Sequence, residues 1–199
     1  MADIARGLVL SERVTDARSL LDQWLTLYDR SNTAFPQTRE VWYVEQTLTA
    51  LMVAASWAVD IPAVGEVRSK RVRASGPSGG RVDVLVQLPD GRAAIEAKIH
   101  WFDNVDAFEA VLGNLEAAEI DARSVDPNFA GRRLALCSGV LEKGNSDLAK
   151  LLDLAINKAT SMRLDVVAWV FSVVTPEVVR FPGGIVLSRV YEGAAPAGP

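Results

Sequence analysis

The chain has 199 residues, of which 49% are hydrophobic and 23% are charged. This balance fits one compact domain over residues 1–192, and it excludes the apolar-poor composition of a disordered protein. The formal net charge of −4 excludes a protein whose whole surface is a basic nucleic-acid-binding patch. We therefore expect any contact with nucleic acid to depend on a local concentration of positive charge.

The single cysteine, Cys137, lies in the apolar segment RRLALCSG, so it can form neither an internal disulfide nor a cysteine-rich zinc site. No segment approaches the ~20 consecutive apolar residues that a membrane-spanning helix requires, and the N-terminus lacks the pattern of a secretory signal. We expect a cytoplasmic protein that has no contact with a membrane. The tail GAAPAGP, residues 193–199, is predicted to be disordered.

Hydrophobic periodicity predicts two amphipathic helices, over residues 8–28 and 37–59, before any strand. Strands, a loop and further helices should follow in this order: strand 64–73, glycine-rich loop 75–80, strands 81–88 and 92–99, helix 103–122, strand 133–137, helix 146–162, and strands 165–174 and 184–191. The pattern predicts an α/β (α+β) fold, with a central mixed β-sheet flanked by helices.

The strands at residues 81–88 and 92–99 should form a hairpin. Asp90 and Gly91 are typical of a two-residue loop, because both tolerate positive φ. Counting back from that loop places Asp83 opposite Lys98, with Glu96 diagonal to Asp83 on the same face. The other face should be apolar, and its members are Val82, Val84, Val86, Ile95, Ala97 and Ile99.

Three charged side chains on one hairpin can also form an ordinary solvated ladder. Such a ladder needs no function and contributes about 0.2–1 kcal/mol per pair. Here, however, the charges interrupt the runs RVDVLV and AAIEAKI, which are apolar enough for strands covered on both faces. A charge buried there is costly unless it is paired or bound to a metal. We therefore favour a functional site over a ladder.

The sequences GGRVDVLV and AIEAK, which end at Val86 and Lys98, resemble the motif of the PD-(D/E)XK nuclease superfamily. In that pattern an acid on one strand is followed by an acid-x-Lys triplet on the next strand, and a preceding helix carries a further acid. Asp83 matches the first acid, Glu96 matches the second, and Lys98 matches the lysine. The resemblance implies a restriction-endonuclease-like core.

The carboxylates of Asp83 and Glu96 are hard oxygen ligands of the kind that Mg²⁺ or Mn²⁺ binds. The resemblance implies that the backbone carbonyl of Ala97 also faces the metal, and that Lys98 serves the attacking water and the transition-state charge. It implies a metal-dependent endonuclease that hydrolyses phosphodiester bonds in nucleic acid, with DNA as the expected substrate. It also allows a homodimer.

The helical acid of the family has two candidates, Glu40 and Glu45. Glu40 has an ordinary explanation, since an acid near the start of a helix complements the helix dipole. Glu45 lies deeper in the predicted helix, beside its apolar stripe. We predict that Glu45 is the helical acid, which in the family acts through a water on the metal. Its alternative is a glutamate at the core boundary that reaches solvent.

The positive charge closest to this motif comes from Arg68, Lys70, Arg71 and Arg73. These side chains could contact phosphates, or they could simply keep an edge strand soluble. The sole histidine, His100, follows Lys98 by two residues on the same strand face. It could contact a phosphate or make an ordinary hydrogen bond at the end of the strand.

One residue departs from the family pattern, because Val82 stands where the family has the proline of its name. The order of elements supports the resemblance only over residues 37–137. Two other functions therefore stay open. One is a catalytically inactive nuclease-fold module for binding or assembly, and the other is a small α/β immunity or adaptor protein.

Overall fold

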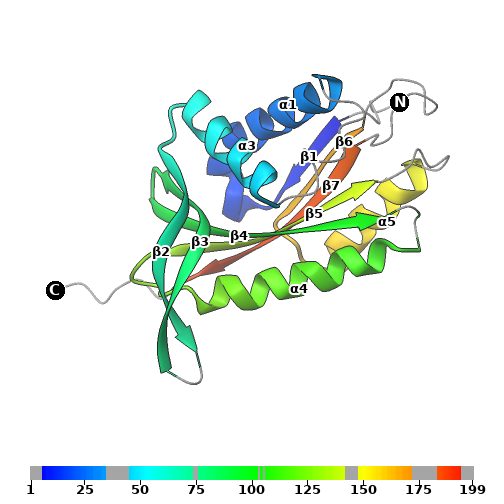
Figure 1. The fold of residues 1–199 in the computed structure, drawn as a ribbon. Coiled ribbons are helices and arrows are strands. Elements are labelled where there is room, and N and C mark those ends of the chain that lie inside the picture. The colour runs from blue at the N-terminus through cyan, green and yellow to red at the C-terminus, as the bar shows by residue number, and fades with distance from the viewer. Residues whose placement is uncertain are drawn as a thin grey trace.

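The computed structural model describes the following residues: 6–34, 45–73, 76–102, 104, 106–141, 148–171 and 183–193. In this part of the chain a seven-stranded sheet has helices on both faces (Figure 1). The strands in spatial order are β1 (Arg6–Leu10), β6 (Val166–Phe171), β7 (Gly183–Glu192), β5 (Arg132–Leu141), β4 (Gly91–Phe102), β3 (Gly76–Leu88) and β2 (Ala63–Arg73). The pair β4 and β5 is parallel and the other pairs are antiparallel. The predicted mixed sheet of the α+β class is confirmed.

The helices lie in two layers, one on each face of the sheet (Figure 1). Their bounds are α1 (Arg18–Ala34), α3 (Glu45–Ala58), α4 (Phe108–Ser124) and α5 (Leu148–Met162), with a short 3-10 helix, η1, at Glu12–Ala17. Trp24 of α1 and Met52 of α3 share one apolar cluster with Ile95 of β4. Leu115 of α4 shares the other cluster with Ile185 of β7. None of the described helices is both long and apolar enough to cross a membrane.

The predicted helix over residues 8–28 is wrong at its start. Residues 6–10 form β1, which pairs with β6, and the α-helix begins only at Arg18. A strand therefore precedes both helices. The close approach depends on Gly7, because a Cβ there would lie 2.0 Å from Cζ2 of Trp169. Local periodicity could not reveal this strand, since its partner follows about 160 residues later.

The hairpin between β3 and β4 forms as predicted, but its loop is displaced. Leu88 pairs with Gly91, so the two loop residues are Pro89 and Asp90 instead of Asp90 and Gly91. Gly91 opens β4 with φ 138°, a backbone conformation that favours glycine. Leu88 is buried at 4% exposure, and pairing it with Gly91 keeps it in the core.

The displaced loop changes which charges are opposite each other. The pairing between β3 and β4 extends from Leu88 opposite Gly91 to Val84 opposite Ile95. Continued by one residue, this register would set Asp83 against Glu96, so the predicted pairing with Lys98 is wrong. A shift of two residues keeps every side chain on its predicted face, because side chains alternate with period two.

Beyond Val84, β3 leaves β4 and continues with β2 as a two-stranded ribbon that passes the end of α4 (Figure 1). We call its residues, 67–73 and 76–82, the arm. Two expectations change here. The predicted loop 75–80 is largely strand, since Arg73 pairs with Gly76. Val82 packs with Ala94 in a separate cluster, whereas Val84 belongs to the cluster of Ile95.

The remaining predicted elements are present with shifted bounds. The predicted strand 133–137 is the longer β5, and the predicted helices 103–122 and 146–162 correspond to α4 and α5. The predicted strand 165–174 is described as far as Phe171, where β6 ends. At the start of the predicted disordered tail, Gly193 donates a backbone hydrogen bond of 2.7 Å to the carbonyl of Gly131. Residues 194–199 lie outside the described part.

Candidate functional site

Glu96 is a buried acid in the middle of the sheet. It lies on β4, between β3 and β5, and is only 3% exposed. Nη2 of Arg71, a buried arginine on the arm, lies 2.7 Å from Oε1 of Glu96. The two groups form a buried ion pair, and the guanidinium of Arg71 compensates the charge of Glu96. Burial raises the pKa of Glu96 to about 7, although the charge of Arg71 lowers it.

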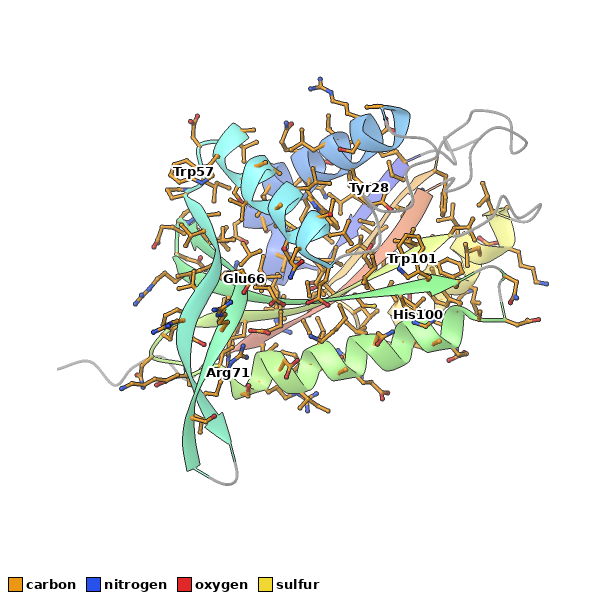
Figure 2. The ribbon with its side chains drawn as sticks, in the orientation of Figure 1. Tyr28, Trp57, Glu66, Arg71, His100 and Trp101 are labelled. Carbon is orange, nitrogen blue, oxygen red and sulfur yellow. The ribbon has the colours of Figure 1, made fainter. Side chains whose placement is uncertain are left out.

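Arg71 also connects the arm to the end of α4 (Figure 2). Its Nη1 donates hydrogen bonds to the backbone carbonyl of Asp121 at 2.9 Å and to Oγ of Ser124 at 3.2 Å. Next to it, the backbone N–H of Asp126 donates to the carbonyl of Lys70 at 3.1 Å. The guanidinium of Arg71 is therefore fully engaged by protein groups, and the structure does not present it as a free phosphate ligand.

Asp83 lies where β3 separates from β4. Its Oδ2 accepts a hydrogen bond of 2.7 Å from the backbone N–H of Ala97. Burial raises the pKa of Asp83, whereas this hydrogen bond and the positive charge of Lys98 oppose the rise. The first acid of the predicted motif is thus fixed directly beside the acid-x-Lys segment.

Glu66 is a site residue that the sequence did not single out. It lies on β2, with φ 55° in the left-handed region, between the pairs that Gly65 and Val67 make with β3. Such a conformation costs free energy and is concentrated at functional sites. Its negative charge contributes to the raised pKa of Asp83. Its other neighbour is Arg81, whose Nη1 lies 3.3 Å from Oε2 of Glu66 in an exposed ion pair.

Glu45 reaches the same site from α3, of which it is the first residue. Burial raises its pKa, the charge of Lys98 lowers it, and the charge of Asp83 raises it further. These mutual effects place Glu45 near both residues. The alternative candidate, Glu40, lies outside the described residues.

Lys98 completes the cluster. Its Nζ lies 3.3 Å from Oδ2 of Asp121 on α4. Burial lowers the pKa of Lys98, but the carboxylates of Glu45, Asp121 and Asp83 together raise it. Sequence reasoning missed Asp121. The one signal it offered is an acid in the last turn of a helix, where it opposes the helix dipole.

The arrangement brings together carboxylates from five elements around two cations. No group of three or more Asp, Glu, His or Cys donors in the described residues is arranged to hold a metal ion. Mg²⁺ nevertheless needs only one or two carboxylates when waters complete its shell. Glu96 could supply one such carboxylate, because it is a buried hard oxygen ligand, although its Oε1 faces Arg71 in the structure. Asp83 is the second acid, with one oxygen held by Ala97.

The predicted nucleic-acid contacts divide between two faces of the arm. Arg68 and Lys70 alternate along β2 with the buried Ser69 and Arg71, so they point to the other face. There they line a cavity of about 430 Å³, together with Phe129. Strand alternation therefore separates Arg68 and Lys70 from Arg71.

The last two predicted contacts are His100 and Arg73. Nδ1 of His100 lies 2.7 Å from the side-chain amide of Asn114 on α4. This is the ordinary hydrogen bond that we considered as the alternative to a phosphate contact. The side chain of Arg73 lies outside the described part.

Comparison of the chain with protein-family profiles, with curated proteins and with solved structures found no match. The function must therefore be argued from the geometry of the site and from the resemblance of its motif.

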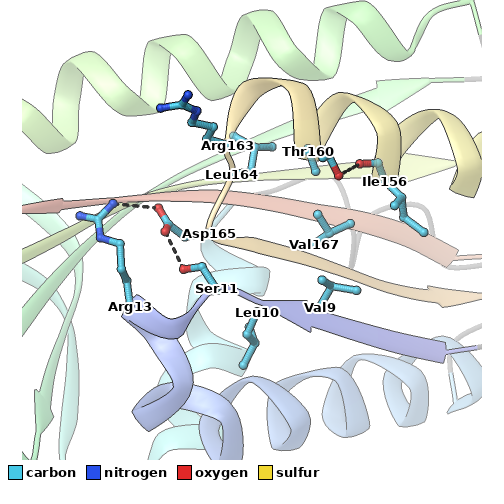
Figure 3. Close-up of a pocket in the computed structure, with 11 residues that line it drawn as sticks. Val9, Leu10, Ser11, Arg13, Ile156, Thr160, Arg163, Leu164, Asp165 and Val167 are labelled. Atoms are coloured by element: carbon cyan, nitrogen blue, oxygen red, sulfur yellow. Dashed lines mark hydrogen bonds and ion pairs between the residues drawn. The ribbon is translucent and has the colours of Figure 1, made fainter.

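A second hollow lies far along the sheet, between β1, β6 and α5 (Figure 3). Its volume is about 500 Å³, and its lining is mainly apolar. At its edge the buried Asp165 accepts hydrogen bonds from the hydroxyl of Ser11 at 2.7 Å and from the backbone N–H of Val190 at 2.8 Å. Arg13 lies 3.4 Å from the same carboxylate. The polar groups around Asp165 are thus satisfied by protein partners.

Proposed function

We propose that the protein is a metal-dependent nuclease that hydrolyses phosphodiester bonds in nucleic acid, with DNA as the first substrate to test. The observation that carries this proposal is the grouping of three acids around Asp83, whose charge raises the pKa of both Glu45 and Glu96 and which lies near Lys98. These three acids come from three elements, and the pKa of each is raised by burial. Grouped acids whose charged forms are disfavoured gain free energy when a cation binds. A restriction-endonuclease-like core is part of the same proposal.

Asp83 and Glu96 would hold the metal, for which Mg²⁺ and Mn²⁺ suit their oxygens best. The metal would supply positive charge to the scissile phosphate. Glu45 and Asp121 lie around this position and would keep the site negative. Their combined charge selects a small, strongly charged cation over a lysine or arginine of a partner, because the electrostatic gain grows with the charge of the cation.

Lys98 would stabilise the negative charge that develops on the phosphate. Its raised pKa keeps its amine protonated at neutral pH. In its protonated form Lys98 would orient the attacking water and offset transition-state charge.

The test is cleavage of plasmid, linear and single-stranded DNA, and of RNA, in Mg²⁺, Mn²⁺ or EDTA. We expect metal-dependent cleavage by the natural protein and none by Asp83→Asn. Lys98→Ala should lower turnover by ~10²-fold or more, because the lost interaction is made in the transition state. Lys158→Ala is the matched control, since Lys158 makes a surface ion pair with Glu109. Equal specific activity in all four proteins would refute the site assignment.

A catalytically inactive nuclease-fold module is the second candidate, and one observation favours it. Arg71 already neutralises Glu96 through an ion pair within the chain. If that ion pair is permanent, the acids have a structural role and the protein binds or assembles without cleaving. Absence of cleavage and of metal binding would support this candidate.

A further inference from the structure

We propose that Arg71 holds the cation position at Glu96 and is displaced from it when a metal binds there, so that metal binding releases the arm from α4. This inference rests on the metal-binding part of the proposed function. It assigns Arg71 a role opposite to the phosphate contact suggested by its place in the sequence.

The first step is competition for one oxygen. Nη2 of Arg71 lies 2.7 Å from Oε1 of Glu96, and both side chains are at least nine-tenths buried. Mg²⁺ would bind that oxygen at about 2.1 Å, which would place two positive charges next to each other in a buried setting. The guanidinium and the metal would therefore compete for this oxygen of Glu96.

The second step is that the fold makes room for Arg71. Gly80 lies beneath its side chain on the neighbouring strand, and a Cβ at Gly80 would lie 2.7 Å from both Cγ and Nε of Arg71. At Gly79, by contrast, an added Cβ would meet nothing within 4 Å. Neither glycine has a positive φ that would itself require glycine. Gly80 thus lets Arg71 lie flat across the arm and reach Glu96.

The third step links the ion pair to the arm. The same guanidinium donates to the carbonyl of Asp121 and to Oγ of Ser124 at the end of α4. When Arg71 leaves Glu96, these two hydrogen bonds must also be broken or rearranged. The backbone hydrogen bond between Asp126 and Lys70 would then be the main remaining link between arm and helix end.

The experiment is a titration of each protein with Mn²⁺ alone. Calorimetry and the electron paramagnetic resonance signal of free Mn²⁺ both measure the binding. The proteins are the natural chain, Arg71→Gln, Gly80→Ala and the matched control Gly79→Ala. If Arg71 leaves Glu96 about one-tenth of the time, its removal should tighten Mn²⁺ binding by about tenfold. Gly80→Ala should tighten binding in the same direction, because it displaces the guanidinium without removing its charge. Gly79→Ala should leave the affinity unchanged.

Hydrogen exchange of the arm is the second readout. In the natural chain, amides of residues 67–73 and 76–82 should exchange faster when Mn²⁺ is bound, and in Gly80→Ala they should exchange faster without metal. Adding Glu96→Gln to Arg71→Gln should abolish the gain in affinity. Gly80→Ala also serves if Arg71→Gln does not fold.

The outcomes separate this inference from the proposed function. Tighter Mn²⁺ binding in both variants without any cleavage would support the role of Arg71 and refute the nuclease. Cleavage by the natural chain with equal Mn²⁺ affinity in all four proteins would refute the role of Arg71 and leave the nuclease standing. Absence of Mn²⁺ binding in every protein would refute both.

Discussion

Two buried acids in this protein have different surroundings. Asp165, next to the hollow of Figure 3, is 4% exposed and accepts hydrogen bonds from Ser11 and from the backbone of Val190. Glu96 is 3% exposed, but its Oε1 faces the guanidinium of Arg71. Burial is nearly the same in both places, so it does not distinguish a structural acid from a functional one.

The difference lies in what satisfies each carboxylate. Two neutral donors, Ser11 and the backbone of Val190, fix Asp165 in one arrangement, and the half-exposed Arg13 adds a longer ion pair. A single charged partner from a separate arm compensates Glu96, and one cation can be replaced by another. We conclude that a buried acid with an exchangeable cation, among other acids, is the better candidate for a metal ligand.

The largest change in stability is expected for Asp165→Ala. This variant leaves the buried N–H of Val190 and the hydroxyl of Ser11 without their acceptor, which should lower the free energy of unfolding by about 4 kcal/mol. Urea unfolding measures the loss. Arg13→Ala is the control, and it should cost under about 1 kcal/mol because Arg13 is half-exposed. Equal losses in both variants would show that the ion pair, and not the hydrogen bonds, holds Asp165.

Glu96→Gln should give a smaller effect that depends on pH. The folded pKa of Glu96 is about 7, above its ordinary value of 4.5, so the folded state keeps a proton that the unfolded state has released. The contribution of Glu96 to the free energy of unfolding is therefore fully present below pH 4.5, and it is lost as the pH rises through 7. From pH 4.5 to pH 8 the natural protein should lose about 3 kcal/mol relative to Glu96→Gln.

Urea unfolding of both proteins between pH 4.5 and pH 8 measures this difference, because every other titrating group is common to the two chains. A stability difference that does not change with pH would mean that Arg71 compensates the ionised Glu96 completely. In that case the carboxylate of Glu96 would be as fully compensated as that of Asp165, and the proposed difference between the two acids would be wrong.

The sequence was sufficient for the parts of the site that depend on local pattern. The hairpin motif predicted that Asp83 lies beside the acid-x-Lys segment. The loop was predicted at the wrong position, but the resulting register shift of two residues does not move side chains to the other face of the strand. Glu45 was selected from its position within a helix, and the structure brings it close to Lys98. Alternation and helical spacing act over a few residues, so they can be counted from the sequence.

The partners of these residues could not be predicted, because they depend on contacts between distant segments. The direction of Arg71 follows from the separation of the arm from β4 and from the space above Gly80. Asp121 reaches Lys98 only because α4 packs across the sheet. For the same reason β1 was missed, since its pairing with β6 is fixed by the tertiary fold.

Metal binding should offset the free-energy cost of ionising the buried Glu96, and it should not affect Asp165. At a Mn²⁺ concentration of 100 times its dissociation constant, the free energy of unfolding should rise by about 2.7 kcal/mol. The gain should be smaller at pH 6 than at pH 8, because Glu96, with a pKa of about 7, must release its proton to bind the metal. Thermal and urea unfolding with and without Mn²⁺ measure it.

Two variants make this measurement specific. Asp83→Asn should remove the Mn²⁺ stabilisation, whereas Arg13→Ala, beside Asp165, should keep all of it. Stabilisation that persists in Asp83→Asn would place the metal elsewhere on the protein.

The smallest effect is expected at the exposed pair of Arg81 and Glu66, which contains the same two residue types as the pair of Arg71 and Glu96. The pair at the surface is 3.3 Å long, and its side chains are 65% and 50% exposed. Water screens such a pair, so Arg81→Gln should change the free energy of unfolding by less than about 0.5 kcal/mol.

Arg71→Gln, in contrast, removes the buried positive charge that faces the buried acid Glu96. Its effect on the free energy of unfolding should be much larger at pH 8 than at pH 5, where Glu96 holds its proton. Urea unfolding of both variants at the two pH values tests the point. A similar, pH-independent change in both would show that pairing alone sets the effect, whereas a pH-dependent change confined to Arg71→Gln would show that burial makes the ion pair at Glu96 responsive to its charge.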